Sequence, residues 1–340
     1  MPVSPNANRP ATATRLRRVS SDDLTIRRVR LGRSFGYRDA EGAKITDADV
    51  LGRIRALAIP PAYEDVRIAA DPQAHLQAVG HDEAGRVQHR YHPEWEKVRE
   101  RRKLKRLGRL IEALPRLRAR IAADIKTRAL CREKALACAA AIIDRCHLRV
   151  GNESYARANG SHGTSTLLKR HVTLSGTRVA LHFRGKGGKE IACAIDDGPL
   201  ARALARIVAL PGRRLLQYRD AEGTVAPIRA AEVNAYLRQA CGLSVSSKDL
   251  RMLAANAAAA ELLLAGEEIA SETGRKRQLA DIMRAISERL ANTPAVVRKS
   301  YVHAIVVEAY ASGRLQRSYA KARARAGCSR IERALGLLAA

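Results

Sequence analysis

The alternation of apolar and polar residues divides the chain into parts of different character. Between residues 34 and 95, short runs with alternating apolar positions are separated by turn-forming residues, as in SFGYRDAEGAKIT and HLQAVGHDEAGRVQHRYH. Such runs predict a small module of strands, with Asp-Glu-Ala-Gly as a hairpin connection and one short helix near residues 47–57. From residue 96 onward, leucine and isoleucine recur at helical spacing, which predicts long helices.

The second part contains one clearly β-type stretch, HVTLSGTRVALHFRGKGGKEIACAI at residues 171–195. Ser-Gly and Gly-Lys-Gly-Gly are turn signals, so this stretch predicts three short strands. From about residue 197 the pattern is helical again, and no internal repeat is visible. The fold class expected is α+β: a small β-rich N-terminal domain at 34–95, then a larger, mostly α-helical domain at 96–340 with a three-stranded β-hairpin segment.

Residues 1–33 differ from both parts. They combine Pro, Ser, Asn and Ala with eight arginines and few large apolar residues. Such a composition offers little apolar surface to offset the entropy of ordering the chain. We therefore expect a disordered basic arm.

The charge of the chain points to a polyanionic partner. Sixty-two Lys and Arg against 34 Asp and Glu leave a formal net charge of +28. Thirteen of these cations fall between residues 97 and 130, with three acids, so one helical face there is strongly cationic. A solvated charged face is the alternative, but the imbalance of sign favours a surface that contacts polyphosphate. No apolar run approaches the roughly 20 residues that span a bilayer, and the N-terminus has no apolar signal region. The interpretation is a cytoplasmic, nucleoid-associated protein that binds nucleic acid and no membrane.

Metal, nucleotide and disulfide chemistry find little support. The six cysteines, at 131, 138, 146, 193, 241 and 328, form no C-x-x-C pair, so we expect reduced structural thiols and no metal site. The acidic pairs at 22–23 and 196–197 lack the further carboxylates of a two-metal nuclease. The GKGGKE stretch at 185–190 lacks the spacing of a nucleotide-binding loop and lies between two strands, so no nucleotide is expected.

Four places combine cations with a predicted turn or helix end: HLRVGNESY, the 185–190 hairpin, SSKDLRMLAANAAAAELLL and LANTPAVVRKSYVH. DNA cleavage without a metal needs a nucleophile, cations around the phosphate and a proton donor for the leaving oxygen. Tyr301, in the last stretch, is the candidate nucleophile. On spacing alone, Val297, Tyr301, Ala304 and Ile305 also fit one face of a helix, so Tyr301 as a core residue is the alternative.

The order and spacing of these elements resemble the active site of type IB DNA topoisomerases, and most closely the small bacterial, poxvirus-like branch. The matching residues are R-x-G-x-x-x-Y (Arg149 to Tyr155), Gly185-Lys186, K-D-L-R ending at Arg251, and N-T-P at Asn292 followed by R-K-S-Y at Tyr301. IPPAYEDV and GHDEAGRVQHRY resemble the N-terminal DNA clamp of that branch. The resemblance covers residues 34 to about 315.

The resemblance implies a role for each matched residue. Tyr301 would form a 3′-phosphotyrosyl link, Arg149 and Arg251 would bind the non-bridging oxygens, Lys186 would be the general acid, and Asn292 a further donor. The positions expected to touch DNA are Arg86, Gln88, His89, Tyr91 and Tyr155. The enzyme would be a monomer clamped around duplex DNA that relaxes supercoils without ATP, metal or cofactor.

Two other functions fit part of the pattern. A tyrosine recombinase shares the Arg, Lys, Arg and Tyr set, but such enzymes resemble one another in an H-x-x-R motif where this chain has Lys248-Asp-Leu-Arg251. A non-enzymatic protein that coats DNA would need only the net charge and the basic arm.

Overall fold

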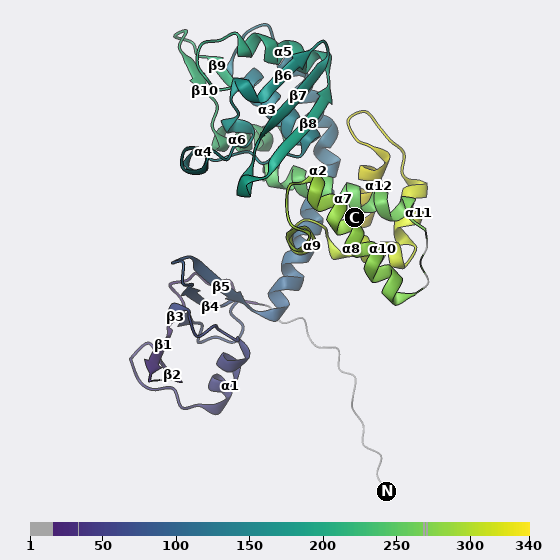
Figure 1. The fold of residues 1–340 in the computed structure, drawn as a ribbon. Coiled ribbons are helices and arrows are strands. Elements are labelled where there is room, and N and C mark those ends of the chain that lie inside the picture. Colours follow the sequence, from purple (N-terminus) through teal and green to yellow (C-terminus); the bar gives the residue numbers. More distant parts are fainter. Residues whose placement is uncertain (1–15, 33, 268, 270) are drawn as a thin grey trace. The chain divides into compact units, whose positions relative to one another are not determined.

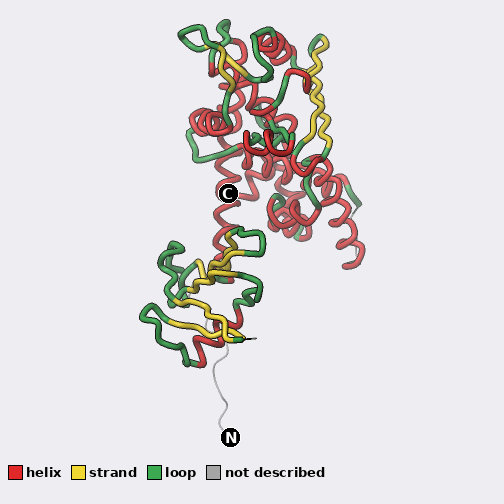
Figure 2. The backbone as a smooth tube through the Cα atoms, turned by 60° about the vertical axis from the view of Figure 1, so that its left-hand side comes forward, coloured by secondary structure: helices red, strands yellow, loops and turns green. Residues whose placement is uncertain are grey.

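The chain forms two compact units, residues 1–103 and 104–340, and their boundary falls within the long helix α2. The computed structural model describes residues 16–32, 34–267, 269 and 271–340, and each unit is described by itself (Figures 1 and 2). Residues 1–15, which include half of the predicted basic arm, lie outside the described part.

The first unit is built on a five-stranded antiparallel sheet with the strand order β2-β1-β3-β4-β5 and the short helix α1. Its elements are β1 (Ile26–Leu31), β2 (Ser34–Arg38), α1 (Ala48–Ala56), β3 (Glu64–Ile68), β4 (Leu76–His81) and β5 (Val87–Tyr91). The predicted short helix is confirmed, and Asp47 begins it by accepting hydrogen bonds from the backbone N–H groups of residues 49 and 50. The predicted hairpin connection after His81 is confirmed as well.

The prediction of disorder for residues 16–32 is wrong. Residues 26–31 form β1, which pairs with β2 on one side and β3 on the other. Leu24 and Ile26 are buried in the cores on the two faces of the sheet. The arginines find local partners, since Arg28 donates to the carbonyl of Pro60 at 3.1 Å and lies 4.2 Å from the ring centroid of Phe35. The prediction from average composition failed because two apolar side chains, Leu24 and Ile26, are enough to anchor the segment although most of its other residues are polar or charged.

The second unit is mostly helical and carries two small sheets. Its helices are α2 (Pro93–Lys126, shared with the first unit), α3 (Arg132–Cys146), α4 (Glu153–Asn159), α5 (Gly198–Val208), α6 (Ala230–Cys241), α7 (Ser247–Ala265), α8 (Glu272–Arg289), α9 (Pro294–Ser300), α10 (Ala304–Ala311), α11 (Arg314–Lys321) and α12 (Arg330–Ala339), with 3₁₀ turns η1 (Thr164–Thr166), η2 (Lys169–His171) and η3 (Lys186–Gly188). Its strands are β6 (Val172–Ser175), β7 (Arg178–Arg184), β8 (Glu190–Asp196), β9 (Gln217–Arg219) and β10 (Val225–Pro227).

The three strands predicted between residues 171 and 195 form an antiparallel sheet in the order β6-β7-β8. Helix α5 packs against β6 and β7, and α3 packs against β8. The β9–β10 hairpin was not predicted, because its strands have three residues each and offer too short a period to detect. The α+β fold class, with a β-rich first part and a mostly helical second part, is confirmed.

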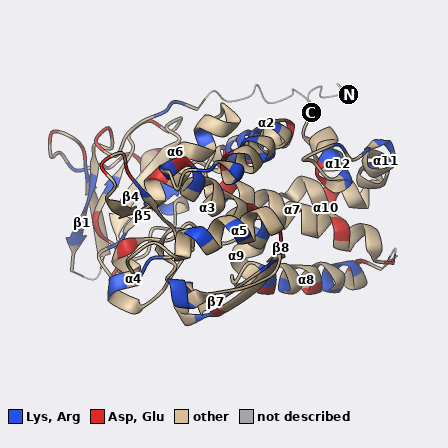
Figure 3. Ribbon diagram, turned by 90° about the horizontal axis from the view of Figure 1, so that it is seen from above, with Lys and Arg blue, Asp and Glu red and all other residues tan. Residues whose placement is uncertain are grey.

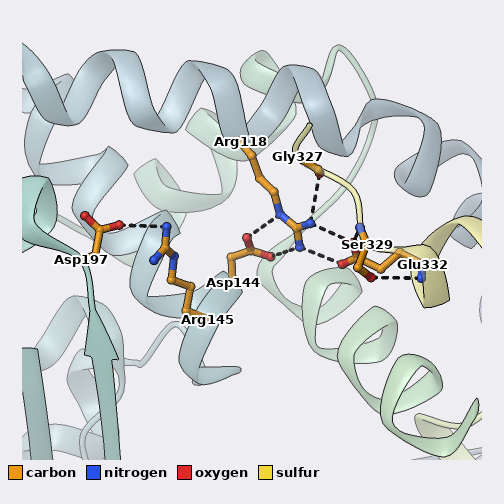
Figure 4. A network of polar contacts seen from close by, with 7 residues as sticks. All are labelled: Arg118, Asp144, Arg145, Asp197, Gly327, Ser329 and Glu332. Carbon is orange, nitrogen blue, oxygen red and sulfur yellow. Dashed lines mark hydrogen bonds and ion pairs between the residues drawn. The ribbon is translucent and has the colours of Figure 1, made fainter. Parts of the chain in front are cut away.

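Helix α3 lies at the centre of the second unit. Its alanines and isoleucines are buried from Ala135 to Ile143, and helices α5, α6 and α7 pack around it. The C-terminal helix α12 is tied to it through Arg118 of α2, whose guanidinium bridges Asp144 of α3 and Glu332 of α12 at 2.8 Å each (Figure 4). This ionic link joins the two ends of the second unit.

The prediction of reduced thiols is wrong for one pair of cysteines. Cys146 and Cys193 form a disulfide with their Cα atoms 6.1 Å apart, and the other four thiols are free. The two residues are 47 positions apart and meet because β8 packs beside α3, a contact that sequence spacing does not reveal.

No helix in the described ranges combines the length and the apolar character that crossing a membrane requires.

Candidate active site

The segment after α3 places the first cation of the site. Helix α3 ends at His147, whose φ of 53° turns the chain out of the helix, and Arg149 follows two residues later. Gly151, at a φ of 99°, lies directly against Gly163, where an added Cβ would come within 2.5 Å of the Gly151 Cα and 2.7 Å of the Arg149 carbonyl oxygen. The glycine of the R-x-G motif is therefore required by packing, because only a pair of glycines lets the loops that contain Gly151 and Gly163 approach so closely.

Arg149 joins this loop to the segment that begins α9. Its guanidinium donates to the carbonyl of Ala291 at 3.3 Å and to the side-chain oxygen of Asn292. Thr293 caps α9 by accepting a hydrogen bond from the backbone N–H of Val296, and Pro294 occupies the first helical position, as the sequence predicts. Asn292 thus lies just before the helix, with its side chain turned toward Arg149.

Arg251 provides the second cation from the first turns of α7. It is 3% exposed, and its guanidinium donates to the carbonyls of His147 and Leu290. These carbonyls belong to the ends of α3 and α8, so Arg251 joins three helices. No carboxylate pairs with it among the described residues, which leaves its positive charge available to a ligand.

Tyr301 follows the last residue of α9 and is 8% exposed. The helix does not continue through it, since α10 begins only at Ala304. Asn256 of α7 holds both sides of this break, donating to the Tyr301 carbonyl at 2.9 Å and accepting from the His303 backbone N–H at 2.9 Å. The Arg251 guanidinium lies 5.6 Å from the centroid of the Tyr301 ring.

The surroundings of Tyr301 favour its phenolate. Burial raises the pKa of the phenol, but the charge of Arg251, polar contacts with Arg251 and Asn292, and the charge of Arg149 lower it further, so the net pKa lies below the ordinary value. Tyr236 shows the opposite behaviour: burial and a 2.8 Å hydrogen bond to Asp124 raise its pKa. Of these two tyrosines, Tyr301 is the one electrostatically prepared to act as a nucleophile.

Two buried donors beside Tyr301 make no hydrogen bond of normal geometry with the described residues. They are Nε of Arg251 and Nδ2 of Asn292. Buried polar groups are nearly always satisfied, and leaving one unpaired costs roughly 1–3 kcal/mol. Two buried donors that lack acceptors of normal geometry beside one phenol suggest that an anionic ligand completes the site.

Lys186 lies at the tip of the β7–β8 hairpin, where Gly187 and Gly188 adopt φ values of 72° and 74°. Its side chain is exposed and lines, together with Arg149, Tyr155 and His162, an open cavity of about 390 Å³. Lys189 ties the same tip to the site by donating to the backbone carbonyl of Asn292. The hairpin therefore brings a primary amine to the edge of the Arg149 loop.

The structure thus gathers most of the predicted residues of the second unit. Arg149, Arg251, Asn292 and Tyr301 surround one point, and Lys186 and Tyr155 line the adjoining cavity. Tyr155 is 58% exposed, which suits a side chain that meets a large ligand.

The predicted DNA contacts of the first unit lie on or beside β5. Arg86 and Gln88 both donate to the carboxylate of Asp82 at 2.9 Å, and these hydrogen bonds lower the pKa of Asp82 to about 2. His89 and Tyr91 stack with ring centroids 5.9 Å apart, and Tyr91 is 40% exposed. Together they form a polar and aromatic surface on this edge strand.

Sequence analysis missed three residues that shape the site: Asn256, Lys189 and Gly163. The sequence does indicate a role for Asn256, because it is the one polar residue in the run LAANAAAA and a polar side chain within a buried helix needs hydrogen-bond partners. No local feature of the sequence indicates the roles of Lys189 and Gly163, since those roles depend on segments that are distant in the sequence.

Comparisons with known proteins agree with this arrangement. A family described as "Bacterial DNA topoisomerase IB, N-terminal domain" matches residues 34–82, and one described as "Eukaryotic DNA topoisomerase I, catalytic core" matches residues 92–326. The chain is also 30% identical over 292 residues to the DNA topoisomerase 1B of Acanthamoeba polyphaga mimivirus, a match that covers 84% of this chain and 87% of that protein.

Proposed function

The chain belongs to the type IB DNA topoisomerases, and we propose that it relaxes supercoiled duplex DNA by cutting and resealing one strand through Tyr301. The observation that carries this proposal is the convergence on one buried phenol of Arg149, Arg251 and Asn292, two of whose donors make no hydrogen bond of normal geometry with the described residues. A DNA phosphate would supply the missing acceptors.

In the proposed step, the Tyr301 oxygen attacks a backbone phosphorus and the bond from phosphorus to the 5′ oxygen breaks. The phenolic proton passes to water, and the departing 5′ oxygen takes a proton from Lys186, which leaves a 3′-phosphotyrosyl link and a free 5′-hydroxyl. One phosphate ester replaces another, so resealing requires no ATP. Lys186 is suited to the acid role because it stands on a glycine-rich tip and has no carboxylate partner among the described residues.

The guanidinium groups stabilise the charge that develops on the phosphate. Each planar fork can bond two oxygens at once and stays charged throughout the reaction. Arg149 and Arg251 are already held by backbone carbonyls, so little reorganisation is needed when the phosphate binds.

Both units contribute to DNA binding in this proposal. In the first unit, Arg86, Gln88, His89 and Tyr91 would contact the duplex from β5; in the second, Tyr155 would do so beside the active site. A single chain suffices, since the catalytic residues that the proposal uses all come from the second unit of one molecule. The protein would act where the chromosome lies, bound to the nucleoid.

Relaxation of a supercoiled plasmid in EDTA without ATP tests the function. The wild-type protein should remove supercoils of both signs, and Tyr301→Phe should leave them intact while still binding the plasmid. Tyr310→Phe is the matched control, because Tyr310 is a half-buried tyrosine of the neighbouring helix α10, and it should relax at the wild-type rate. Supercoils that persist with the wild type, or that disappear with Tyr301→Phe, would refute the proposal.

A further inference from the structure

The disulfide between Cys146 and Cys193 joins two elements of the candidate active site. Cys146 is the last residue of α3, and Arg149 follows it three positions later. Cys193 lies on β8, the strand that leads away from the hairpin tip with Lys186. The bond therefore connects the helix that places the first guanidinium to the hairpin that carries the proposed general acid.

The disulfide anchors β8 close to this tip. Cys193 lies three residues from Glu190, the last residue of the β7–β8 ladder before the tip. At about 3.3 Å per residue, this is roughly 10 Å of strand. The tip itself is held by weaker contacts, because the Arg184 carbonyl accepts a hydrogen bond from the His162 N–H at 2.8 Å and Lys189 donates to a backbone carbonyl.

The far end of β8 is tied to α3 as well. Arg145, the neighbour of Cys146, forms an ion pair with Asp197 at 2.8 Å (Figure 4). Asp197 directly follows β8 and also caps the start of α5. When the disulfide is broken, β8 therefore stays fixed at its far end, and the freedom that the strand gains is concentrated at the tip.

The charges of the tip oppose its approach to the site when no DNA is bound. Arg184, Lys186 and Lys189 follow one another within six residues, and Figure 3 shows basic residues on the hairpin of β7 and β8. Lys186 lines the same cavity as Arg149, and like charges repel. A covalent link to α3 holds the hairpin against this repulsion, and it does so without an acidic side chain that would compete with a phosphate for the cations.

We propose that the Cys146–Cys193 disulfide positions Lys186 for its proton transfer, so that reduction of the bond slows strand cleavage without weakening DNA binding. This rests on the proposed function, because it assigns the bond a part in the departure of the 5′ oxygen. A dithiol reductant supplies two electrons and two protons: the S–S bond breaks, two thiols form, and the reductant becomes a disulfide. Cys193 is half-buried on an edge strand, where a small dithiol can reach it.

Single-turnover cleavage of a short duplex by the full chain tests the proposal. The wild type is oxidised with glutathione disulfide, and the bond is verified by alkylating free thiols, digesting without reductant and detecting the joined Cys146 and Cys193 peptides by mass spectrometry. Treatment with dithiothreitol should slow cleavage by about tenfold, because the general acid is no longer held in place. The affinity for the duplex should stay the same.

A second substrate, with sulfur in place of the leaving 5′ oxygen, isolates the proton transfer. A thiol has a pKa of about 8.5, so the 5′ thiolate departs without a proton. Oxidised and reduced protein should cleave this substrate at rates within about twofold of each other, because no general acid is needed. A general loosening of the second unit would instead slow the cleavage of both substrates.

Two variants complete the test. Cys193→Ala removes the bond, so it should behave as the reduced wild type does on both substrates and should not respond to dithiothreitol. Cys131→Ser is the matched control, because Cys131 is a free thiol at the other end of α3. This control should respond to dithiothreitol as the wild type does.

Equal cleavage of the oxygen substrate by oxidised and reduced wild type would overturn the role of the disulfide, and so would faster cleavage after reduction. An equal slowing of both substrates, or the absence of the joined peptides from the oxidised protein, would overturn it too. These comparisons within the wild type stand whether or not Cys193→Ala folds. If the oxidised wild type cleaves neither substrate, the proposed function itself fails, and the role of the disulfide with it.

Discussion

At Tyr301, burial and charge act in opposite directions on the same hydroxyl. A residue that is 8% exposed and spaced like a core residue ordinarily has a raised pKa, as Tyr236 does. The cations of Arg251 and Arg149 outweigh burial at Tyr301, and the pKa falls. Tyr301 therefore packs in the core, and it is also surrounded by the cations that a nucleophilic tyrosine would need.

The pH dependence of cleavage reports this balance. The cations favour the phenolate, so the single-turnover rate of the wild type should rise with pH and level off below the ordinary tyrosine pKa of about 10. Arg251→Gln removes the largest favourable charge, so its rising limb should move to higher pH and its rate at neutral pH should fall by about 10²-fold or more. Arg251→Lys keeps a charge and should move the limb less. An unshifted limb in Arg251→Gln would contradict the electrostatic role.

Asn256 is a positioning residue, because it touches the backbone on both sides of Tyr301 and has no contact with the phenol oxygen among the described hydrogen bonds. Asn256→Ala would leave the Tyr301 carbonyl and the His303 N–H without their partner, and the turn should shift. We expect single-turnover cleavage to slow by roughly tenfold or more while affinity for duplex DNA stays unchanged.

Asn234→Ala is the control for Asn256→Ala. Asn234 accepts a hydrogen bond from the Ser247 N–H at the start of the same helix but does not touch the Tyr301 turn. It should lose stability without a specific loss of cleavage. If the two variants cleave equally well, Asn256 has only a structural role.

At the scale of elements, local signals determined much of the structure. The start of α9 follows from local sequence, because capping by Thr293 and the fixed φ of Pro294 are local effects. Likewise, the glycines of the 185–190 stretch predicted the hairpin that carries Lys186. The end of α9 could not be predicted, because a buried amide on α7 interrupts the helix from 45 positions away.

The same distinction explains the errors in the first unit and among the cysteines. Strand β1 is formed by pairing with two neighbours, and the Cys146–Cys193 bond forms where α3 meets β8. Composition and spacing describe a segment by itself, whereas these features belong to pairs of segments. The candidate site was accessible from sequence mainly through its resemblance to a family, which supplies such long-range pairings.

The contact between Gly151 and Gly163 offers a test at this scale. In Gly163→Ala the new methyl group would come within 2.5 Å of the Gly151 Cα, so the backbone must move and Arg149 with it. We expect a loss of stability of about 1–3 kcal/mol and a larger relative loss of cleavage, measured by thermal unfolding and single-turnover kinetics.

Gly52→Ala is the matched control, since Gly52 lies within α1 with no atom near its would-be Cβ. That change should leave cleavage unaltered and raise stability slightly, because alanine favours a helix more than glycine does. Normal cleavage by Gly163→Ala would show that the close approach does not position Arg149.

At the scale of the whole molecule, the last helix is fastened to the first helices of the second unit by charge. Arg118 bridges Asp144 and Glu332, and Ser329 begins α12 by capping the backbone N–H of Glu332 (Figure 4). Burial raises the pKa of Glu332, but Arg118 and Ser329 lower it more, so the folded carboxylate holds its charge to lower pH than usual. The position of α12 depends on this link.

Acid should weaken the ion pair between Arg118 and Glu332, because protonation removes the charge of the carboxylate. A carboxylate whose pKa is lower in the folded than in the unfolded protein stabilises the fold. This stabilisation is complete above the unfolded pKa of about 4.3 and is lost as the pH falls through the lower folded pKa. Glu332→Gln should therefore unfold more easily at pH 7, by on the order of 3 kcal/mol, and this difference should shrink in acid. Glu272→Gln removes one partner of an exposed ion pair, and it should change neither the stability at pH 7 nor the way stability depends on pH. Equal stability of Glu332→Gln and wild type at pH 7 would contradict the role of the network.

The most direct test of the central claim is to trap the protein on DNA and identify the linked residue. Wild-type protein is mixed with duplex DNA in EDTA, quenched with denaturant and digested, and the DNA-bearing peptide is sequenced by mass spectrometry. The account predicts a 3′-phosphate attached to Tyr301, and no adduct from Tyr301→Phe under the same conditions. An adduct on any other residue, or an undiminished adduct in Tyr301→Phe, would contradict it.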